Sequence, residues 1–322
     1  NTSHYFYCQM LVKGTVYKST GSWYSFKGED GAFYNCRIKG KFRTKGIKAT
    51  NPVAVGDFIT TTGQSEEDLT ITEIEPRKNY IIRKSTNLSK QHHIISANID
   101  QVVMIATVDF PYTSLEFIDR ISITAEAYDV PFVLILNKAD LFEGEHRNQL
   151  EFYMNIYESI GIQVYISSSK NSEAISDLIQ VFKNKKSLVT GHSGVGKSTL
   201  VNTIDPKLNL KTSAVSDHWK TGKHTTTFAE MFDLSFGGQI IDTPGLRAFG
   251  LIEFEKENLS HYFKEMQPYL NKCKFHNCTH LHEPGCQLIQ AVKADLIPPS
   301  RYKTYCNIML DDNSVHRENI HQ

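Results

Sequence analysis

The segment Gly191-His192-Ser193-Gly194-Val195-Gly196-Lys197-Ser198 follows the G-x-x-x-x-G-K-S pattern of a phosphate-binding loop. An apolar run, 188–190, precedes it, and a helix-like stretch that includes Thr199 follows, which is the strand–loop–helix setting that the pattern requires. Its glycines allow backbone N–H groups to turn toward phosphate oxygens at a helix N-terminus. A glycine turn with a solvated lysine would not need that setting, so the segment predicts a nucleotide site.

Two further motifs flank this loop, in an unusual order. Asn137-Lys138-Ala139-Asp140 lies upstream and has the N-K-x-D pattern that reads guanine in GTPases. Asp242-Thr243-Pro244-Gly245 lies downstream and has the D-x-x-G pattern that senses a γ-phosphate. In an ordinary Ras-like GTPase the guanine-reading motif follows the other two. The set is therefore complete but rearranged, and it predicts a circularly permuted GTPase.

Each motif residue has a chemical role in this interpretation. Lys197 supplies a charge for the β- and γ-phosphates, and Ser198 ligates Mg²⁺. Asp140 can accept two hydrogen bonds from guanine N1 and N2, a pair that adenine does not offer. Asp242 holds Mg²⁺ through water. The other expected guanine and phosphate contacts come from Asn137, which braces the loops, Lys138 along the base plane, the loop residues Ser168, Ser169 and Lys170, and the N–H of Gly245.

The run Gly222-Lys-His-Thr-Thr-Thr227 resembles a loop that closes over the metal. Either Thr225 or Thr226 is expected to ligate Mg²⁺, and a plain threonine-rich loop is the alternative. Leu246 follows Gly245, so no glutamine is available there to orient the attacking water. His224 is the nearest substitute and is our candidate catalytic residue; its alternative role is packing or contact with RNA.

The region from about 98 to 251 alternates strand-like and helix-like runs, which predicts an α/β fold with a mainly parallel sheet. Helical spacing of apolar residues covers 115–128 and 149–160, and Gly237-Gly238 has the form of a two-residue hairpin turn. The strands expected are 101–107, 131–136, 162–166, 188–190, 228–236 and 239–242.

The region from about 11 to 83 is rich in short β-prone runs separated by turns. Five short strands suit a small barrel of the OB type, a fold whose strand face and loops bind oligonucleotides; a generic barrel is the alternative. A basic run without acidic residues crosses this region, with aromatic residues interleaved, which is typical of RNA binding but also of a solvated face. Its cations are Arg37, Lys39, Lys41, Arg43, Lys45 and Lys48.

The C-terminal region is helical and polar around a cluster of cysteines, with helices expected at 286–295 and 299–310. Cys273-x4-Cys278-x-His280-x5-Cys286 offers three thiolates and one imidazole at chelating spacing. Such a set closes a tetrahedral zinc shell with no position for water, so one structural zinc ion is expected. His276 and His282 are rival ligands that would need poorer turns. The other cysteines, Cys8, Cys36 and Cys306, are expected to be unpaired.

The composition of the chain limits which classes of protein it can belong to. The chain has 322 residues, 40% hydrophobic and 22% charged, with a formal net charge of zero and six cysteines. No global field attracts nucleic acid or membranes, and no run approaches the about 18 apolar residues of a membrane span. Six cysteines in so long a chain do not make a disulfide scaffold, and the crowding of three of them into Cys273–Cys286 favours a metal site in a reducing compartment. We treat residues 1–10 as a leader, either foreign to the native chain or upstream of a natural start at Met10.

The order of N-K-A-D (137–140), S-S-K (168–170), G-H-S-G-V-G-K-S (191–198), G-K-H-T-T-T (222–227) and D-T-P-G (242–245) resembles the circularly permuted, small-subunit-dependent GTPases of the RsgA/YjeQ type. The β-rich N-terminus and the cysteine cluster also match, so the resemblance extends from Leu11 to the C-terminus. It implies an OB-type β-barrel at 11–84, a circularly permuted P-loop α/β GTPase core at 85–252 and a C-terminal helical zinc-binding domain at 253–322.

The resemblance also implies a function. Such a protein is a cytoplasmic, monomeric GTPase that converts GTP to GDP and phosphate with Mg²⁺. It binds rRNA of the small ribosomal subunit late in maturation, and that particle stimulates hydrolysis. Two alternatives differ in class: an RNA-binding scaffold with a vestigial nucleotide site, which the intact Lys197, Ser198 and Asp242 oppose, and an ATPase, which Asp140 opposes.

Overall fold

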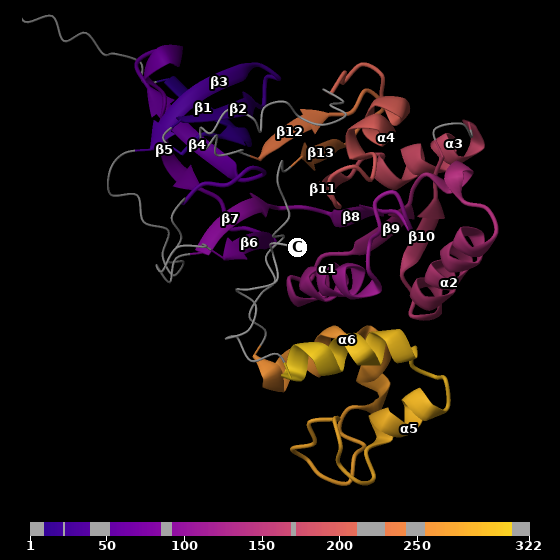
Figure 1. Cartoon of the computed structure of the whole chain (residues 1–322). Coiled ribbons are helices and arrows are strands. Elements are labelled where there is room, and N and C mark those ends of the chain that lie inside the picture. Colours follow the sequence, from indigo (N-terminus) through magenta and orange to yellow (C-terminus); the bar gives the residue numbers. More distant parts are fainter. Residues whose placement is uncertain are drawn as a thin grey trace, which may run out of the picture.

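The structure is a computed structural model that describes residues 10–21, 23–38, 52–84, 92–168, 172–210, 229–242 and 255–310. Three bodies follow one another along the chain: a β-barrel, an α/β body and a helical C-terminal body (Figure 1). Within the described residues, no helix combines the length and the apolar character needed to cross a membrane.

The N-terminal body is a closed barrel of five strands in the order β1-β2-β3-β5-β4, and β1 pairs again with β4 to close it. Strand β2 shows why it forms: Tyr24 and Phe26 point into the core, whereas Trp23 on the alternate face is exposed. The five strands are β1 (Met10–Ser19), β2 (Trp23–Gly28), β3 (Phe33–Ile38), β4 (Phe58–Gly63) and β5 (Thr70–Ile74), and the 3₁₀ helix η1 (Glu66–Asp68) precedes β5.

The α/β body contains a sheet with the order β10-β9-β8-β11-β13-β12, parallel except for β12. Side chains of β8 alternate between two cores, and all six of its residues are buried, as expected for a central strand covered on both faces. The strands are β8 (Gln101–Ala106), β9 (Phe132–Leu136), β10 (Gln163–Ile166), β11 (Lys186–Thr190), β12 (Glu230–Asp233) and β13 (Gln239–Asp242).

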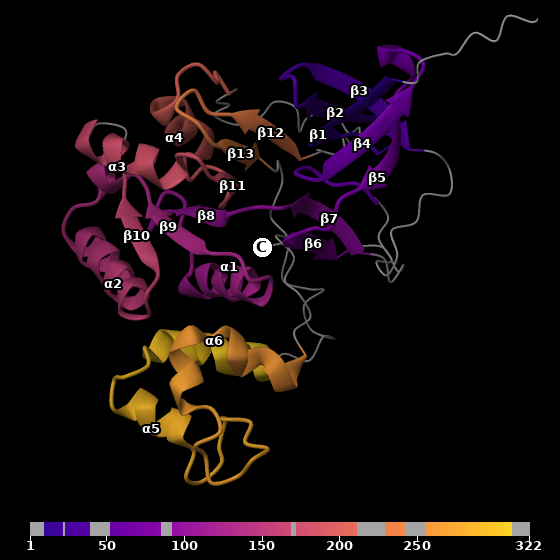
Figure 2. The ribbon, with the colours of Figure 1, turned by 180° about the vertical axis from the view of Figure 1, so that it is seen from behind.

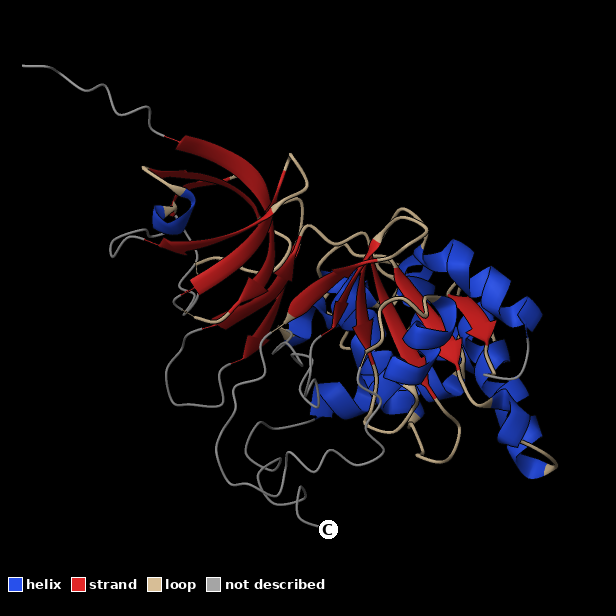
Figure 3. Ribbon diagram, turned by 90° about the horizontal axis from the view of Figure 1, so that it is seen from above, coloured by secondary structure: helices blue, strands red, loops and turns tan. Residues whose placement is uncertain are grey.

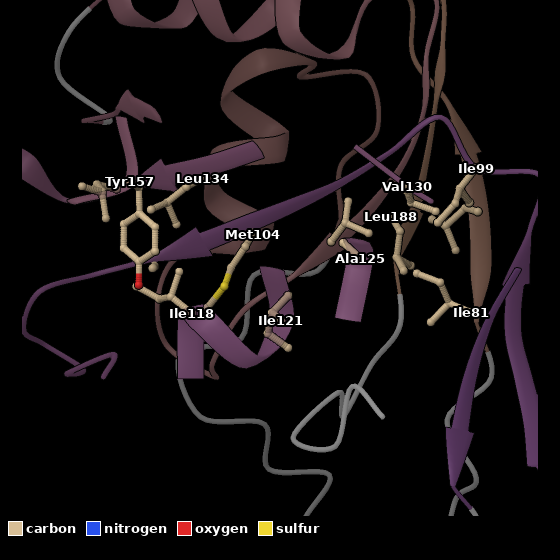
Figure 4. Packing of buried hydrophobic residues seen from close by; sticks show 14 of the residues in the cluster. Ile81, Ile99, Met104, Ile118, Ile121, Ala125, Val130, Leu134, Tyr157 and Leu188 are labelled. Carbon is tan, nitrogen blue, oxygen red and sulfur yellow. The ribbon is translucent and has the colours of Figure 1, made fainter. Parts of the chain in front are cut away.

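Helices cover the two faces of this sheet. Val102, Met104 and Leu134 pack with α1 and α2, and Figure 4 shows Ile118 and Ile121 of α1 beside Met104. The opposite face packs against α3 and α4. The bounds are α1 (Leu115–Ala127), α2 (Glu145–Ser159), α3 (Ser172–Phe182) and α4 (Lys197–Ile204), with the 3₁₀ helix η2 (Ala139–Leu141) after β9.

The barrel and the α/β sheet are continuous, because β1 pairs with β12 through Lys18 and Glu230 and the whole forms one sheet of eleven strands. Figure 3 shows the two sets of strands meeting side by side. A separate hairpin of β6 (Tyr80–Lys84) and β7 (His92–Ala97) lies between the two bodies in sequence and flanks the expected boundary at residues 84 and 85.

The C-terminal body consists of short helices around its own small core, and α6 lies along α1 (Figures 1 and 2). Its elements are the 3₁₀ helices η5 (Lys256–Tyr262) and η6 (Lys264–Tyr269), followed by α5 (Gln287–Lys293) and α6 (Pro299–Leu310).

The predicted fold class is confirmed: an OB-like barrel, an α/β body and a C-terminal body that holds the cysteine cluster. One detail of the prediction is wrong. The last pair of the β12–β13 hairpin is Asp233 with Gln239, so residues 234–238 form the connection rather than Gly237 and Gly238 alone. Both glycines have positive φ. The Leu234 N–H donates to the Gly238 carbonyl and the Gly237 N–H donates to the Leu234 carbonyl, which closes the longer turn.

Candidate nucleotide and zinc sites

The described parts of the predicted nucleotide motifs converge at one edge of the α/β sheet. The glycine-rich loop 191–196 leaves the carboxyl end of β11 and runs into α4, and Asn137 directly follows β9. Asp242 is the last residue of β13, paired in register with Val189. Because parallel strands place their carboxyl ends on one side, segments far apart in the chain meet there, where open α/β sheets bind ligands.

Two glycines are required by the path of this loop. Gly191 has φ 142°, and a Cβ there would lie 2.1 Å from the carbonyl oxygen of Ile105. Gly196 has φ 93°, and a Cβ there would lie 2.7 Å from Nδ2 of Asn137. Only glycine accepts both the backbone angle and the close approach, so the loop can pass tightly over β8 and against the Asn137 motif.

Lys197 spans the loop from its C-terminal side. Its Nζ donates to the carbonyl oxygens of Gly191 and His192, at 2.7 Å each. Burial lowers the pKa of Lys197, and the charge of nearby Asp242 opposes that shift. A half-buried ammonium held by two carbonyl oxygens near a carboxylate is suited to the oxygens of a polyphosphate.

Asn137 ties three loops together. Its side chain is buried, and Nδ2 donates to the carbonyl oxygen of Val195 at 2.8 Å. Its Oδ1 accepts from the hydroxyl of Ser167, which follows β10, at 2.7 Å. The contacts are those that a bracing residue makes, and they hold the segment 137–140 against the loop 191–196.

Lys138 and Asp140 lie on the exposed side of this brace. Lys138 has a left-handed backbone, and its Nζ donates to the carbonyl oxygens of Phe110 and Gly194 at 2.6 and 2.7 Å. Asp140 accepts from the Ser168 hydroxyl at 2.9 Å. The Asp140 carboxylate and the loop after β10 are therefore adjacent, as joint recognition of one base requires.

Several of the predicted residues fall outside the described part of the chain: Ser169, Lys170, His224, Thr225, Thr226 and Gly245. Within it, Ser193 and Thr199 are exposed and Val195 is buried, and the His192 ring stacks on Phe117 of α1 with centroids 4.0 Å apart. The stacking contact is not apparent from sequence, because it joins two positions in different elements. It packs the phosphate loop against α1.

The donors at this edge fit Mg²⁺. Ser198 lies in the first turn of α4, and Asp242 ends the strand beside β11. A hydroxyl and a carboxylate are hard oxygen ligands of the kind that this ion prefers, usually together with waters and phosphate oxygens. Ser198 and Asp242 are thus the described residues that could hold the ion, and the ion would neutralise phosphate charge.

The C-terminal cluster fits zinc closely. Cys273, Cys278, His280 and Cys286 bring one donor atom each within 4.8 Å of the others. The Sγ atoms of Cys273 and Cys286 are 3.8 Å apart, and Nδ1 of His280 lies 3.5 and 3.4 Å from them. A tetrahedron with ordinary Zn–S and Zn–N bonds has edges of about 3.8 and about 3.5 Å.

Hydrogen bonds around the cluster hold its loop in shape. Tyr302 and Tyr305 of α6 donate to the carbonyl oxygens of His280 and Thr279, at 2.8 and 2.7 Å. The rival ligands His276 and His282 are exposed and belong to no group of donors in the described chain. Four protein ligands leave no open position, so this group can bind one structural zinc ion.

The barrel carries a basic and aromatic outer face. Arg37 is exposed, with its guanidinium 4.6 Å from the centroid of the Trp23 ring, and Phe33 is also exposed. Trp23 was not among the predicted residues, although alternation in β2 with buried Tyr24 and Phe26 would have placed it outward. The other cations of the predicted RNA-binding run, Lys39, Lys41, Arg43, Lys45 and Lys48, lie outside the described residues.

Known families and sequences resemble this chain over most of its length. The model of the RsgA N-terminal domain matches residues 13–71, and that of the RsgA GTPase matches residues 74–252. A small ribosomal subunit biogenesis GTPase RsgA from Flavobacterium psychrophilum is 49% identical over 313 residues, 96% of each chain. The protein of the same name from Phocaeicola vulgatus is 49% identical over 300 residues, 93% of this chain and 97% of the relative.

Solved structures show the same architecture. YjeQ from Thermotoga maritima superimposes with a TM-score of 0.74 and 30% identity, covering 93% of this chain and 98% of that one. YloQ, described as a circularly permuted GTPase, gives a TM-score of 0.70 at 28% identity, over 95% and 96% of the two chains. With the permuted motifs assembled at one sheet edge, these matches show that the chain belongs to the RsgA GTPase family and is a GTP hydrolase.

Proposed function

We propose that this protein hydrolyses GTP at the edge formed by the ends of β9, β11 and β13, as a small-subunit maturation factor. The observation that carries the proposal is the contact network of Asn137, which joins the base-reading motif to the phosphate loop. Proposed GTP contacts are Asn137, Lys138, Asp140, Ser168, Ser169, Lys170, Gly191, His192, Ser193, Gly194, Val195, Gly196, Lys197, Ser198, Thr199, Asp242 and Gly245.

Catalysis would come from positioning and charge. Lys197 contacts the β- and γ-phosphates, and Ser198 and Asp242 hold Mg²⁺ together with Thr225 or Thr226. Leu246 cannot orient water, so intrinsic hydrolysis is slow in this scheme. His224 accepts a hydrogen bond from the attacking water once its loop closes over the nucleotide.

The small ribosomal subunit is the proposed partner. The relatives reported above are named small ribosomal subunit biogenesis GTPases, and this chain aligns with them over nearly its whole length. The barrel supports RNA contact, because Arg37 and Trp23 form a cationic and aromatic pair on its exposed face. We propose that Lys39, Lys41, Arg43, Lys45 and Lys48 extend this contact to rRNA phosphates.

The domain limits that follow are proposals too: the RNA-binding barrel at 11–84, the GTPase core at 85–252 and the zinc domain at 253–322. The protein would act as a cytoplasmic monomer that binds the subunit in its GTP form. Hydrolysis then serves as a timer for release from RNA.

A single-turnover GTPase assay with and without purified small subunits tests the proposal. We expect slow hydrolysis alone and strong stimulation by subunits, with Lys197→Ala as a control that removes tight GTP binding. Stimulation should persist in Phe152→Ala, which removes an exposed ring from α2. Background turnover with subunits present, despite normal GTP binding, would favour an RNA-binding scaffold instead.

A further inference from the structure

A cluster of polar contacts joins the barrel to the GTPase sheet at Asp233, the last residue of β12. Its Oδ1 accepts from the hydroxyl of Tyr17 of β1 at 2.6 Å, and its Oδ2 accepts from Nζ of Lys27 of β2 at 2.7 Å. Gln239 of β13 donates to the same Oδ1 at 3.3 Å. One carboxylate therefore holds two barrel strands and both strands of the β12–β13 hairpin.

The carboxylate of Asp233 is charged in this arrangement. Burial would raise its pKa, but hydrogen bonds from Lys27 and Tyr17 hold the pKa below the ordinary value. The contact is only partly shielded, since the side chains of Lys27 and Asp233 are 33% and 37% exposed. A competing anion in solution can therefore reach the lysine.

Lys27 also belongs to the outer face of the barrel. Its Nζ lies 5.9 Å from the centroid of Phe33 and 6.0 Å from that of Tyr17, and these two rings meet edge to face at 5.2 Å. Phe33 is 58% exposed. A hollow of about 340 Å³ opens beside it, lined by Tyr17, Lys18 and residues of β12. An exposed ring next to an ammonium has the chemistry to hold an unpaired nucleotide, with the base stacked on the ring and the phosphate at the cation.

The hairpin held by Asp233 leads directly to the proposed catalytic segments. The chain enters β12 at Glu230, shortly after the threonine run 225–227, and leaves β13 at Asp242. Backbone pairing links Glu230 to Asp242, so the two ends move together. The hairpin that Asp233 anchors is therefore next in sequence to both segments.

We propose that the Lys27–Asp233 contact is an autoinhibitory clasp that an unpaired rRNA residue opens. The proposal rests on the proposed stimulation by the small subunit. A nucleotide that stacks on Phe33 draws Lys27 to its phosphate, and Asp233 loses its counter-ion. The hairpin keeps its pairing with β1 and the contact to Tyr17 but loses the ion pair, and it then adopts the arrangement that supports hydrolysis. RNA binding and opening of the contact both depend on Lys27, so the RNA binds more tightly to the open state. Coupling between RNA binding and hydrolysis requires this difference in affinity.

Two single variants separate this clasp from a purely structural contact. Asp233→Asn and Lys27→Met both open the clasp, so each should raise turnover without subunits, by about fivefold. Their effects on subunit affinity should be opposite: Asp233→Asn leaves Lys27 available for phosphate and strengthens binding, whereas Lys27→Met removes the cation and weakens it. A structural contact would shift both variants in the same direction.

The exchanged pair Lys27→Glu with Asp233→Lys tests the same point without loss of the interdomain ion pair. Turnover without subunits should return to the wild-type value, while stimulation stays low because a carboxylate now faces RNA. The control is Lys264→Met, which removes another interdomain ion pair, Lys264 with Glu126 at 2.8 Å, and should change neither quantity. Unfolding midpoints within about 4 °C of wild type establish that each variant is folded.

Unchanged basal turnover in both single variants, or affinity changes of the same sign, would overturn the clasp. The exchanged pair still decides the question should a single variant fail to fold, because full stimulation of that protein is incompatible with competition for Lys27. Lack of stimulation in the wild-type chain would instead refute the proposed function. The two failures are therefore distinguishable.

Discussion

At the scale of single residues, Asp140 is the proposed determinant of base specificity. Its carboxylate lies beside the hydroxyl of Ser168, at the end of the neighbouring strand. Guanine presents two N–H donors to such a carboxylate. Each charge-assisted hydrogen bond contributes about 1.5–3 kcal/mol to binding. Replacing the Asp140 carboxylate by a neutral amide is therefore expected to change both the affinity for GTP and the preference among nucleotides.

We predict that Asp140→Asn weakens GTP binding at least about tenfold and improves binding of XTP, since the asparagine amide can donate to the xanthine O2 atom. Competition titrations with the two nucleotides measure the preference. Asp177→Asn, an exposed position on α3, is the matched control and should bind GTP normally. Retained GTP preference in the Asp140 variant would exclude it as the base reader.

His224 is the residue on which the proposed hydrolysis depends. We expect His224→Ala to lose subunit-stimulated turnover while GTP affinity and subunit binding remain, because the imidazole acts only on the attacking water. Rapid-quench measurements at saturating subunits give the rate. Stimulated turnover within about threefold of wild type, a barrier change below about 0.7 kcal/mol, is incompatible with the role.

At the scale of elements, the loop 273–286 that holds the cysteine cluster and the helix α6 stabilise each other. Tyr302 and Tyr305 point from α6 to the backbone of the loop, and Cys286 directly precedes α5. Metal affinity in so small a module contributes directly to its folding free energy. The loop and both helices are therefore expected to loosen together when zinc is lost.

We predict that zinc chelation or Cys278→Ala raises hydrogen exchange in 273–310 and leaves GTP affinity within about threefold, because the nucleotide residues belong to a separate core. Zinc content and exchange mass spectrometry are the measurements. Cys306→Ala is the control, as Cys306 lies outside the donor group and should retain zinc. One zinc per chain in the Cys278 variant would contradict the ligand assignment.

At the scale of the whole molecule, a buried polar network fastens the C-terminal body to the GTPase core. Arg301 of α6 donates to Asp119 of α1 at 2.9 Å and to Glu265 of η6 at 2.7 Å. Tyr157 and Thr304 donate to the same Asp119 carboxylate, at 2.9 and 2.6 Å. Burial raises the pKa of Asp119, and the charge of Arg301 opposes the shift.

We predict that Arg301→Met destabilises the protein by about 3–5 kcal/mol, because it leaves two buried carboxylates without a cation. Denaturant unfolding gives the free energy. Adding Asp119→Asn should recover part of the loss, and Arg147→Met, which removes an exposed ion pair on α2, should cost no more than about 1 kcal/mol. Equal losses of unfolding free energy in the two arginine variants would show that the buried network does not fasten the C-terminal body to the GTPase core.

The proposed contact of the basic run 37–48 with RNA belongs to the same scale, because it depends on charge spread over many residues. Charge reversal at Lys39, Lys41 and Arg43 should weaken subunit binding and lower the slope of log affinity against log salt, by about one for each phosphate that no longer meets a cation. Intrinsic GTPase activity should stay unchanged, because these residues are not among the proposed GTP contacts. Unaltered subunit binding would identify the run as a solvated face.

Much of the site could be predicted because its chemistry depends on short, contiguous sequence motifs. The phosphate loop needs glycines at set positions, and the zinc cluster needs donors at chelating spacing. The roles of Gly191, Gly196 and Cys273 can therefore be predicted from the residues near them in sequence. Buried strands such as β8 and β9 were also predictable, because continuous apolar runs mark a sheet covered on both faces. The permuted order of motifs then specified the family.

The contacts between the three bodies were decided only by tertiary structure. Tyr17 meets Asp233 across 216 residues, and Arg301 meets Asp119 across 182. In sequence each is an ordinary polar residue in an amphipathic element, with nothing nearby to indicate its partner. A motif can be recognised from its neighbours along the chain. The partner of an interdomain carboxylate depends instead on which surfaces come together when the separate cores pack.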